Sequence, residues 1–158
     1  LYWPRWSAQI LAEARRSLVD DGRCTAESAE WRFRLICDGF PEAEVTGYEH
    51  LVADLRCDAG DRHVLAAAIR GRVDQIVTQN LKHFPDEAVS AYFIEVVSPD
   101  DFLLNALDLY PRELAEIIRE QAAALKRPPM GVDDVLRALS PVAPMFVQQV
   151  ETIIRALE

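Results

Sequence analysis

The segment from Asp58 to Phe84 constrains the fold of this 158-residue chain more than any other. Asp61 opens a run rich in alanine, which predicts a helix to about residue 70. A short β-branched strand follows and ends in Thr78-Gln-Asn80. Open α/β folds place their chemistry at the carboxyl ends of parallel strands. This order therefore predicts that Asp61 and Asn80 lie near one another at one end of a parallel sheet.

Helices and strands alternate around this segment. We expect a second short strand at 95–97, after a helical turn around 86–91, and then a helix from about 100 to 109. The stretch 45–55 favours a short extended piece followed by a short helix. This alternation indicates an α/β fold with a parallel sheet flanked by helices.

Two amphipathic helices are expected before that segment. The first runs from its N-cap Ser7 to about Asp20, and Glu13 lies at the edge of its apolar stripe rather than on the solvent side. The second runs from its cap Thr25 to about residue 38, and its apolar residues Trp31, Leu35 and Ile36 are expected to face inward.

The character of the chain changes at Pro111. Helices are expected at 111–126, 132–139 and 143–157, each with an apolar face. We therefore expect an α/β domain over 1–110 and an all-helical extension over 111–158. These helices either pack on the domain as ordinary core or present a groove for a partner helix, and packing is the favoured interpretation.

Charge and cysteine content limit the classes of function. The net charge of −9, from 17 Lys and Arg against 26 Asp and Glu, is unlike that of a non-specific nucleic-acid binder. It does not exclude an enzyme that touches nucleic acid briefly, because a metal ion between carboxylates reverses the local field. Cys24, Cys37 and Cys57 form no CxxC pair, so neither a disulfide framework nor a zinc site is indicated. We expect them to be reduced and mostly buried, as in a cytoplasmic protein.

The acids and the amide of this chain each have an ordinary structural interpretation. Asp61 can cap a helix, Asp58 can be a solvated turn residue, Glu13 a surface charge and Asn80 a turn former. Taken together they favour a site for Mg²⁺, which takes oxygen ligands, activates water and stabilises charge on a phosphodiester. The chain has no GxSxG, P-loop, GxGxxG or HExxH motif. Among enzymes, an acid-based metal nuclease is the one that the residues support.

Three motifs in order resemble a bacterial PIN domain of the VapC-like toxin type. They are Trp6-Ser7-x-x-Ile10-Leu-x-Glu13, Asp58-x-x-Asp61-Arg-His-Val-Leu-Ala-Ala-Ala and Ile76-Val-Thr78-x-Asn80-Leu-Lys-His-Phe-Pro. The match covers roughly residues 1–104. The resemblance implies a PIN-like sheet and a Mg²⁺- or Mn²⁺-dependent endoribonuclease, the toxin of a toxin–antitoxin pair. The partners that it implies are an RNA substrate, a cognate antitoxin protein and a second copy of the chain in a homodimer.

The resemblance also assigns roles to single residues. Glu13 matches the second acid of the family's cluster and Asp61 matches the third. Asn80 stands where many members have a fourth acid, and Thr78 matches the Thr or Ser of that turn. These four are the implied catalytic residues. The implied metal ligands are Glu13 and Asp61, with Asp58 as an outer-shell partner.

One departure from the family concerns its first acid, which follows an N-terminal strand. Nothing before Glu13 fits that pattern, and the chain begins with Leu1 rather than Met. We therefore expect a truncated chain, a separate N-terminal piece or a degenerate member without catalysis. Nuclease activity is expected of the natural full-length protein, and weak metal binding with little activity of this polypeptide.

Two further interpretations remain open. His63 and His83 next to the acids could form a transition-metal site, but without the ligand spacing of zinc sites this ranks below oxygen-ligated Mg²⁺. Arg62, Lys82 and His83 are candidates to contact RNA phosphate, or are simply solvated. The alternative function is a catalytically inactive PIN-like interaction module, whose helical tail docks a partner protein.

Overall fold

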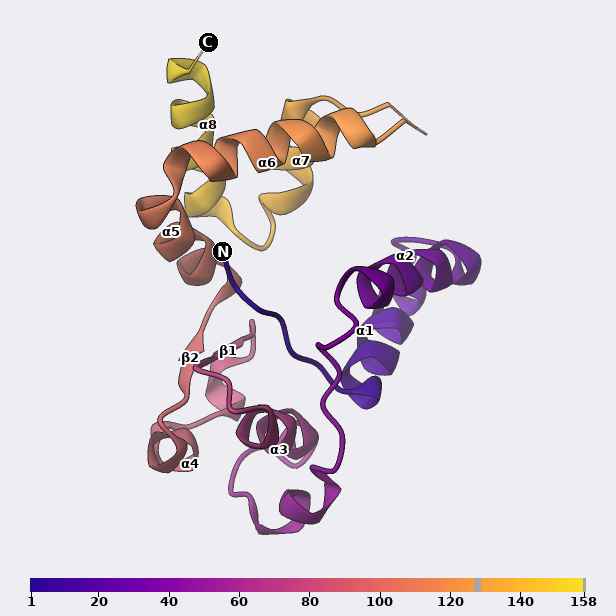
Figure 1. The fold of residues 1–158 in the computed structure, drawn as a ribbon, viewed down its shortest axis with the longest axis vertical. Coiled ribbons are helices and arrows are strands. Elements are labelled where there is room, and N and C mark those ends of the chain that lie inside the picture. Colours follow the sequence, from indigo (N-terminus) through magenta and orange to yellow (C-terminus); the bar gives the residue numbers. More distant parts are fainter. Residues whose placement is uncertain (127–128, 158) are drawn as a thin grey trace. The chain divides into compact units, whose positions relative to one another are not determined.

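The computed structural model describes residues 1–126 and 129–157. Arg127, Pro128 and Glu158, which belong to the expected helical extension, lie outside the described residues. The helices and strands, with 3₁₀ helices written η, are α1 (Ala8–Asp20), α2 (Ala26–Gly39), η1 (Glu49–Asp54), α3 (Arg62–Gly71), β1 (Gln75–Val77), η2 (Leu81–His83), α4 (Asp86–Val89), η3 (Ser90–Tyr92), β2 (Glu95–Val97), α5 (Pro99–Leu109), α6 (Pro111–Ala124), α7 (Val132–Leu139) and α8 (Pro144–Ala156) (Figure 1).

The chain divides into two compact units. The first comprises residues 1–76 and 82–96, and the second comprises 77–81 and 97–158. The second unit therefore takes in α5 as well as the helices of the expected extension. The domain boundary expected at residue 110 stays a prediction, because a compact unit is not by itself a domain that folds alone.

Strands β1 and β2 form a small sheet. The backbone N–H of Glu95 donates to the carbonyl oxygen of Asp74 over 2.9 Å, and that of Thr78 donates to Val97 over 2.9 Å. The paired residues advance together along both strands, so the pairing is parallel. In the part of the chain that the structure describes, this two-stranded sheet accompanies mostly helical structure. The α/β class is confirmed in this coarse form, and the PIN-like sheet stays a prediction.

The core of the first unit is built around α3. Leu65 and Ala66 in the middle of this helix are both 0% exposed. The small side chains of α3 let neighbouring segments approach closely, and η1 packs along it. Buried residues from the loops, from β1 and from α4 complete this core: Val45, Tyr48, Leu55, Ile76, Phe84, Ala88, Val89 and Ile94.

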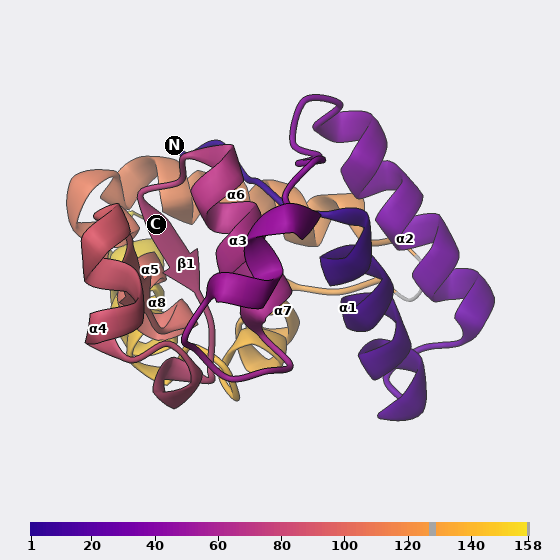
Figure 2. The same cartoon turned by 90° about the horizontal axis from the view of Figure 1, so that it is seen from below.

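Helices α1 and α2 pack against each other as a hairpin (Figures 1 and 2). The expected caps are confirmed, since Ser7 Oγ and Thr25 Oγ1 each accept a backbone N–H from three residues ahead, over 3.2 Å. The expectation that Trp31, Leu35 and Ile36 face inward is wrong, because their exposed fractions are 59%, 50% and 40%. The buried residue of α2 is Ala29, which lies on the opposite side of the helix from Trp31 at 3.6 residues per turn.

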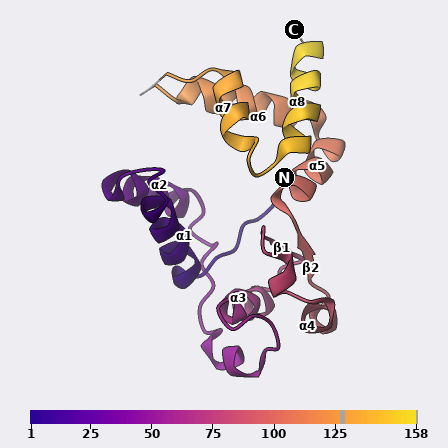
Figure 3. The ribbon, with the colours of Figure 1, turned by 180° about the vertical axis from the view of Figure 1, so that it is seen from behind.

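The helices of the second unit, α5 to α8, form a bundle with a core of its own (Figure 3). Every one of them contributes buried apolar side chains, among them Leu107 from α5 and Phe146 from α8. Asp100 of α5 also binds the start of α8. Its two carboxylate oxygens accept the N–H groups of Met145 and Phe146, over 3.1 and 2.8 Å. These bonds satisfy two backbone donors that a helix N-terminus otherwise leaves open.

The cysteines are less buried than the sequence suggested. Cys37 is exposed on α2, and Cys24 and Cys57 are half-buried; all three are free thiols. The expectation of mostly buried cysteines is wrong, for Cys37 because it lies in the exposed second half of α2. Among the described residues, no helix has both the length and the apolar character needed to cross a membrane.

Candidate metal centre

Asp58, Asp61 and His83 form a group that could hold a metal ion. One ligand atom from each lies within 4.8 Å of the others. Asp58 lies in the loop before α3, Asp61 directly precedes α3, and His83 ends η2. Asp58 is exposed and the other two are partly buried. Two carboxylates and an imidazole at this spacing are a donor set that suits one divalent cation, so the residues present fit such an ion.

Short backbone turns bring the group together. The Asp58 side chain accepts the backbone N–H of Gly60 over 3.0 Å, and its carbonyl accepts the N–H of Asp61 over 3.0 Å. This is the local turn that aspartate commonly forms with its own backbone. The N–H of Asp58 donates in turn to the carbonyl oxygen of His83 over 3.0 Å. The 22-residue separation of Asp61 and His83 is therefore bridged by backbone hydrogen bonding.

The side chain of Asp61 is directed to His83 rather than to its own helix. Nδ1 of His83 lies 2.5 Å from Oδ2 of Asp61, a short hydrogen-bond contact. Asp61 is the N-cap residue of α3, as expected, but its side chain does not form the capping hydrogen bond. Its carboxylate is engaged with the histidine instead.

Glu13 contacts a different histidine. Its Oε2 lies 3.1 Å from Nε2 of His63, which belongs to α3 and is 5% exposed. The approach is close enough for an ion pair, but the N–H is not aligned, and among the described residues Nε2 has no hydrogen-bond partner. Glu13 is not a member of the group formed by Asp58, Asp61 and His83. The structure thus brings together two of the three predicted metal ligands.

Thr78 and Asn80 follow β1 and belong to the second unit. The N–H of Asn80 donates to Oγ1 of Thr78 over 3.1 Å, so the threonine shapes the turn after the strand. The expected proximity of Asn80 to Asp61 stays a prediction.

Sequence reasoning did not assign His83 to the oxygen-ligated metal site. In the sequence, His83 stands alone after the strand, and its distance from His63 along the chain matches no zinc-binding motif. The signal that could have found it is its position in the same turn as Asn80, a turn expected to lie at the site. The neighbouring Cys57 also lies beside the acids, and burial raises the pKa of its thiol, while the nearby Arg62 charge acts in the opposite direction.

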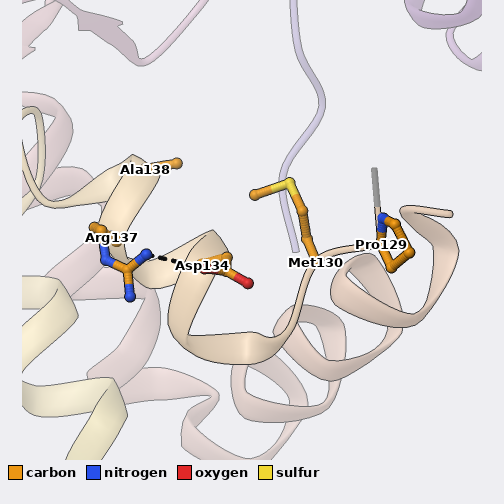
Figure 4. A pocket seen from close by; sticks show the side chains of 5 residues that line it. All are labelled: Pro129, Met130, Asp134, Arg137 and Ala138. Carbon is orange, nitrogen blue, oxygen red and sulfur yellow. Dashed lines mark hydrogen bonds and ion pairs between the residues drawn. The ribbon is translucent and has the colours of Figure 1, made fainter. Parts of the chain in front are cut away.

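An open hollow of about 400 Å³ lies in the second unit, between Pro129 and Ala138 (Figure 4). Asp134 and Arg137 line it and pair with each other over 2.9 Å. The negative charge of Asp134 is therefore already paired with the positive charge of Arg137. Its described lining residues offer no group comparable to the one at α3.

Comparisons with known proteins show what the chain is similar to. Residues 99–152, from the start of α5 into α8, match the family described as "VapC50 C-terminal domain". A protein of Mycobacterium tuberculosis (strain ATCC 25618 / H37Rv), named "Putative ribonuclease VapC50", is 44% identical to the chain over 109 residues. Over these segments the chain is similar to VapC50 and is of the VapC-like type. The resemblance to VapC-like PIN proteins that its motifs indicated is thereby confirmed.

The similarity to VapC50 is limited in extent. The aligned segment is 69% of this chain and 64% of VapC50, so the chain spans less than two thirds of that relative. The "VapC50 C-terminal domain" match begins at the first residue of α5, close to where the second unit resumes at Val97. No solved structure matches the chain significantly.

Proposed function

We propose that this chain is part of a divalent-metal-dependent endoribonuclease. The observation that carries the proposal is the group of Asp58, Asp61 and His83, whose ligand atoms lie within 4.8 Å of one another. The relationship to VapC50, whose name describes a ribonuclease, supports the choice of RNA as substrate. Metal-dependent cleavage of RNA is thus the simplest activity that agrees with both the ligand group and the similarity to VapC50.

The proposed roles come from the resemblance of the sequence motifs to PIN domains, and the metal group of Asp58, Asp61 and His83 supports the roles of the two aspartates. Asp61 and Asp58 hold the metal ion, and Glu13 approaches the same region from α1 as a further acid. Thr78 orients the turn that presents Asn80 to the reacting phosphate. When bound, a divalent ion supplies an activated water and stabilises negative charge on the phosphodiester.

We also propose the domain organisation, the partners and the cellular location that go with this activity. We assign the region before residue 111 to a PIN-like nuclease domain and residues 111–158 to its helical extension. The protein acts as the toxin of a toxin–antitoxin pair in the cytoplasm, as a homodimer that a cognate antitoxin binds. The similarity to VapC50 supports the toxin and antitoxin assignments, and the domain division, the homodimer and the location rest on the resemblance to PIN toxins alone.

The test is RNA cleavage by the protein at its natural length, with Mg²⁺ or Mn²⁺ and with a chelator. The variant Asp61→Asn keeps the shape of the side chain but removes its charge, and cleavage is expected to fall by about 100-fold or more. Asp108→Asn, an exposed position near the end of α5, is the matched control and is expected to cleave normally. Equal cleavage by both variants, or cleavage that survives the chelator, would refute the proposal.

One observation favours the alternative of an inactive interaction module. Glu13, an implied catalytic acid, contacts His63 and is not in the metal group. An inactive module would bind its partner protein equally well with and without the Asp61→Asn substitution, and would not cleave RNA with either metal. RNA cleavage by the wild type, measured beside its partner binding, therefore separates the two functions, because only the nuclease cleaves RNA and loses that activity in the variant.

A further inference from the structure

His83 changes the chemistry of the candidate metal centre. Mg²⁺ takes oxygen ligands in near-octahedral geometry and keeps several of its waters. Imidazole nitrogen is a better ligand for first-row transition metals than for Mg²⁺, and this holds even for Mn²⁺, which stands at the weak end of that series. A group with two carboxylates and one ring nitrogen therefore does not have the all-oxygen character that Mg²⁺ prefers.

The position of His83 is determined by the backbone rather than by a mobile surface side chain. Its carbonyl oxygen accepts the N–H of Asp58 over 3.0 Å, and the next residue, Phe84, is 3% exposed in the core of the first unit. The His83 side chain is 42% exposed and that of Asp61 is 26% exposed. The ring is thus held beside both acids, while the group remains open to an ion from solvent.

The nitrogen nearest the acids is Nδ1, which lies 2.5 Å from Oδ2 of Asp61. It is therefore directed at the carboxylate that is proposed to hold the ion. We propose that a ring nitrogen of His83 is a ligand of that ion, and that it makes this site select Mn²⁺ over Mg²⁺. The inference rests on the proposed function only in taking a divalent ion to bind at this group.

Mn²⁺ itself is the probe that tests this inference. The chain is titrated with Mn²⁺, the free ion is followed by electron paramagnetic resonance, and Mg²⁺ is added as a competitor. Electron spin-echo modulation of bound Mn²⁺ then reports whether a nitrogen-14 nucleus is coordinated. The variants are His83→Ala, His83→Asp and His50→Ala, the last being the matched control on the exposed start of η1.

We expect nitrogen-14 coupling to Mn²⁺ in the wild type and in His50→Ala, and its loss in His83→Ala. Mn²⁺ affinity should fall about tenfold or more in His83→Ala, with little change for Mg²⁺. His83→Asp restores an oxygen donor and should bring the affinities for the two metals closer together. Circular dichroism confirms that each variant is folded.

Absence of nitrogen coupling in the wild type overturns the inference and identifies His83 as a residue that only positions Asp61. Equal losses of Mn²⁺ and Mg²⁺ affinity in His83→Ala overturn the selectivity. The outcome is separate from that of the proposed function. RNA cleavage without nitrogen coupling refutes the inference alone, and nitrogen coupling without RNA cleavage refutes the function alone.

Discussion

The helical bundle of the second unit and the α1–α2 hairpin of the first use their apolar residues differently. In the bundle, each of α5 to α8 buries apolar side chains, and Val150 of α8 is 0% exposed. In the hairpin, α1 is described in full and has no buried residue, and α2 has only Ala29. Both regions consist of amphipathic helices.

The difference shows that an apolar face does not by itself place a helix in a core. Four helices can cover one another's faces, whereas two helices in contact cover only one side of each. The core of the first unit forms instead around α3, whose Leu65 is 0% exposed. Burial, rather than hydrophobic pattern, therefore determines which substitutions affect stability.

The largest difference in stability between substitutions in the two regions is expected when an aromatic ring is removed. Phe146→Ala in α8 removes a side chain that is 2% exposed, and we expect a loss of about 3–5 kcal/mol in the free energy of unfolding. Trp31→Ala in α2 removes a larger ring at 59% exposure and is expected to cost about 0.5 kcal/mol or less. Urea unfolding measures both. Similar losses for the two variants would remove the contrast between the regions.

A smaller effect is expected at the junction of α5 and α8. Asp100→Ala leaves the N–H groups of Met145 and Phe146 without their acceptor and removes a charge that favours a helix N-terminus. We expect a loss of about 1–2 kcal/mol. The control Asp108→Ala lies near the C-terminal end of α5, where a negative charge is unfavourable, and should be neutral or slightly stabilising. Thermal unfolding of the two variants decides whether the bundle depends on this cap.

A gain in stability is expected from a substitution at Phe93 in the first unit. This residue is 92% exposed and has a φ of 58°, in the left-handed region that β-carbons disfavour. Phe93→Gly should raise the free energy of unfolding by up to about 1 kcal/mol, because it removes the steric conflict and little packing. Phe93→Ala retains the β-carbon and should show no such gain. If both variants behave alike in urea unfolding, the backbone conformation is not the cause.

The smallest effect concerns Cys57, beside the core of the first unit. Because burial raises the pKa of its thiol, the protonated form favours the folded state. This contribution is fully present below the unfolded pKa of about 8.5 and is lost as pH rises through the raised value. In a variant with Cys24→Ser and Cys37→Ser, iodoacetamide should react with Cys57 more slowly in the folded protein than in urea. Equal rates would show that this part of the core is open.

Local features of the fold could be predicted because they depend on neighbours in the chain. The caps at Ser7 and Thr25, the strand after α3 and the bundle helices follow from residue type and spacing over a few positions. The orientation of Trp31 could not be predicted, because it depends on how much of the surface of α2 another helix covers. The contact between Asp61 and His83 could not be predicted either, since the N-cap pattern of Asp61 indicated a hydrogen bond to the backbone of its own helix.

The sequence by itself determined the order of helices and strands, the acids that carry the candidate chemistry and the VapC-like family. The tertiary structure alone decided which histidine each acid contacts. Asp61 is paired with His83, 22 residues away, and Glu13 with His63 on another helix. The physical reason is that periodicity specifies the faces of an element, whereas contacts between distant residues depend on the path of every loop between them.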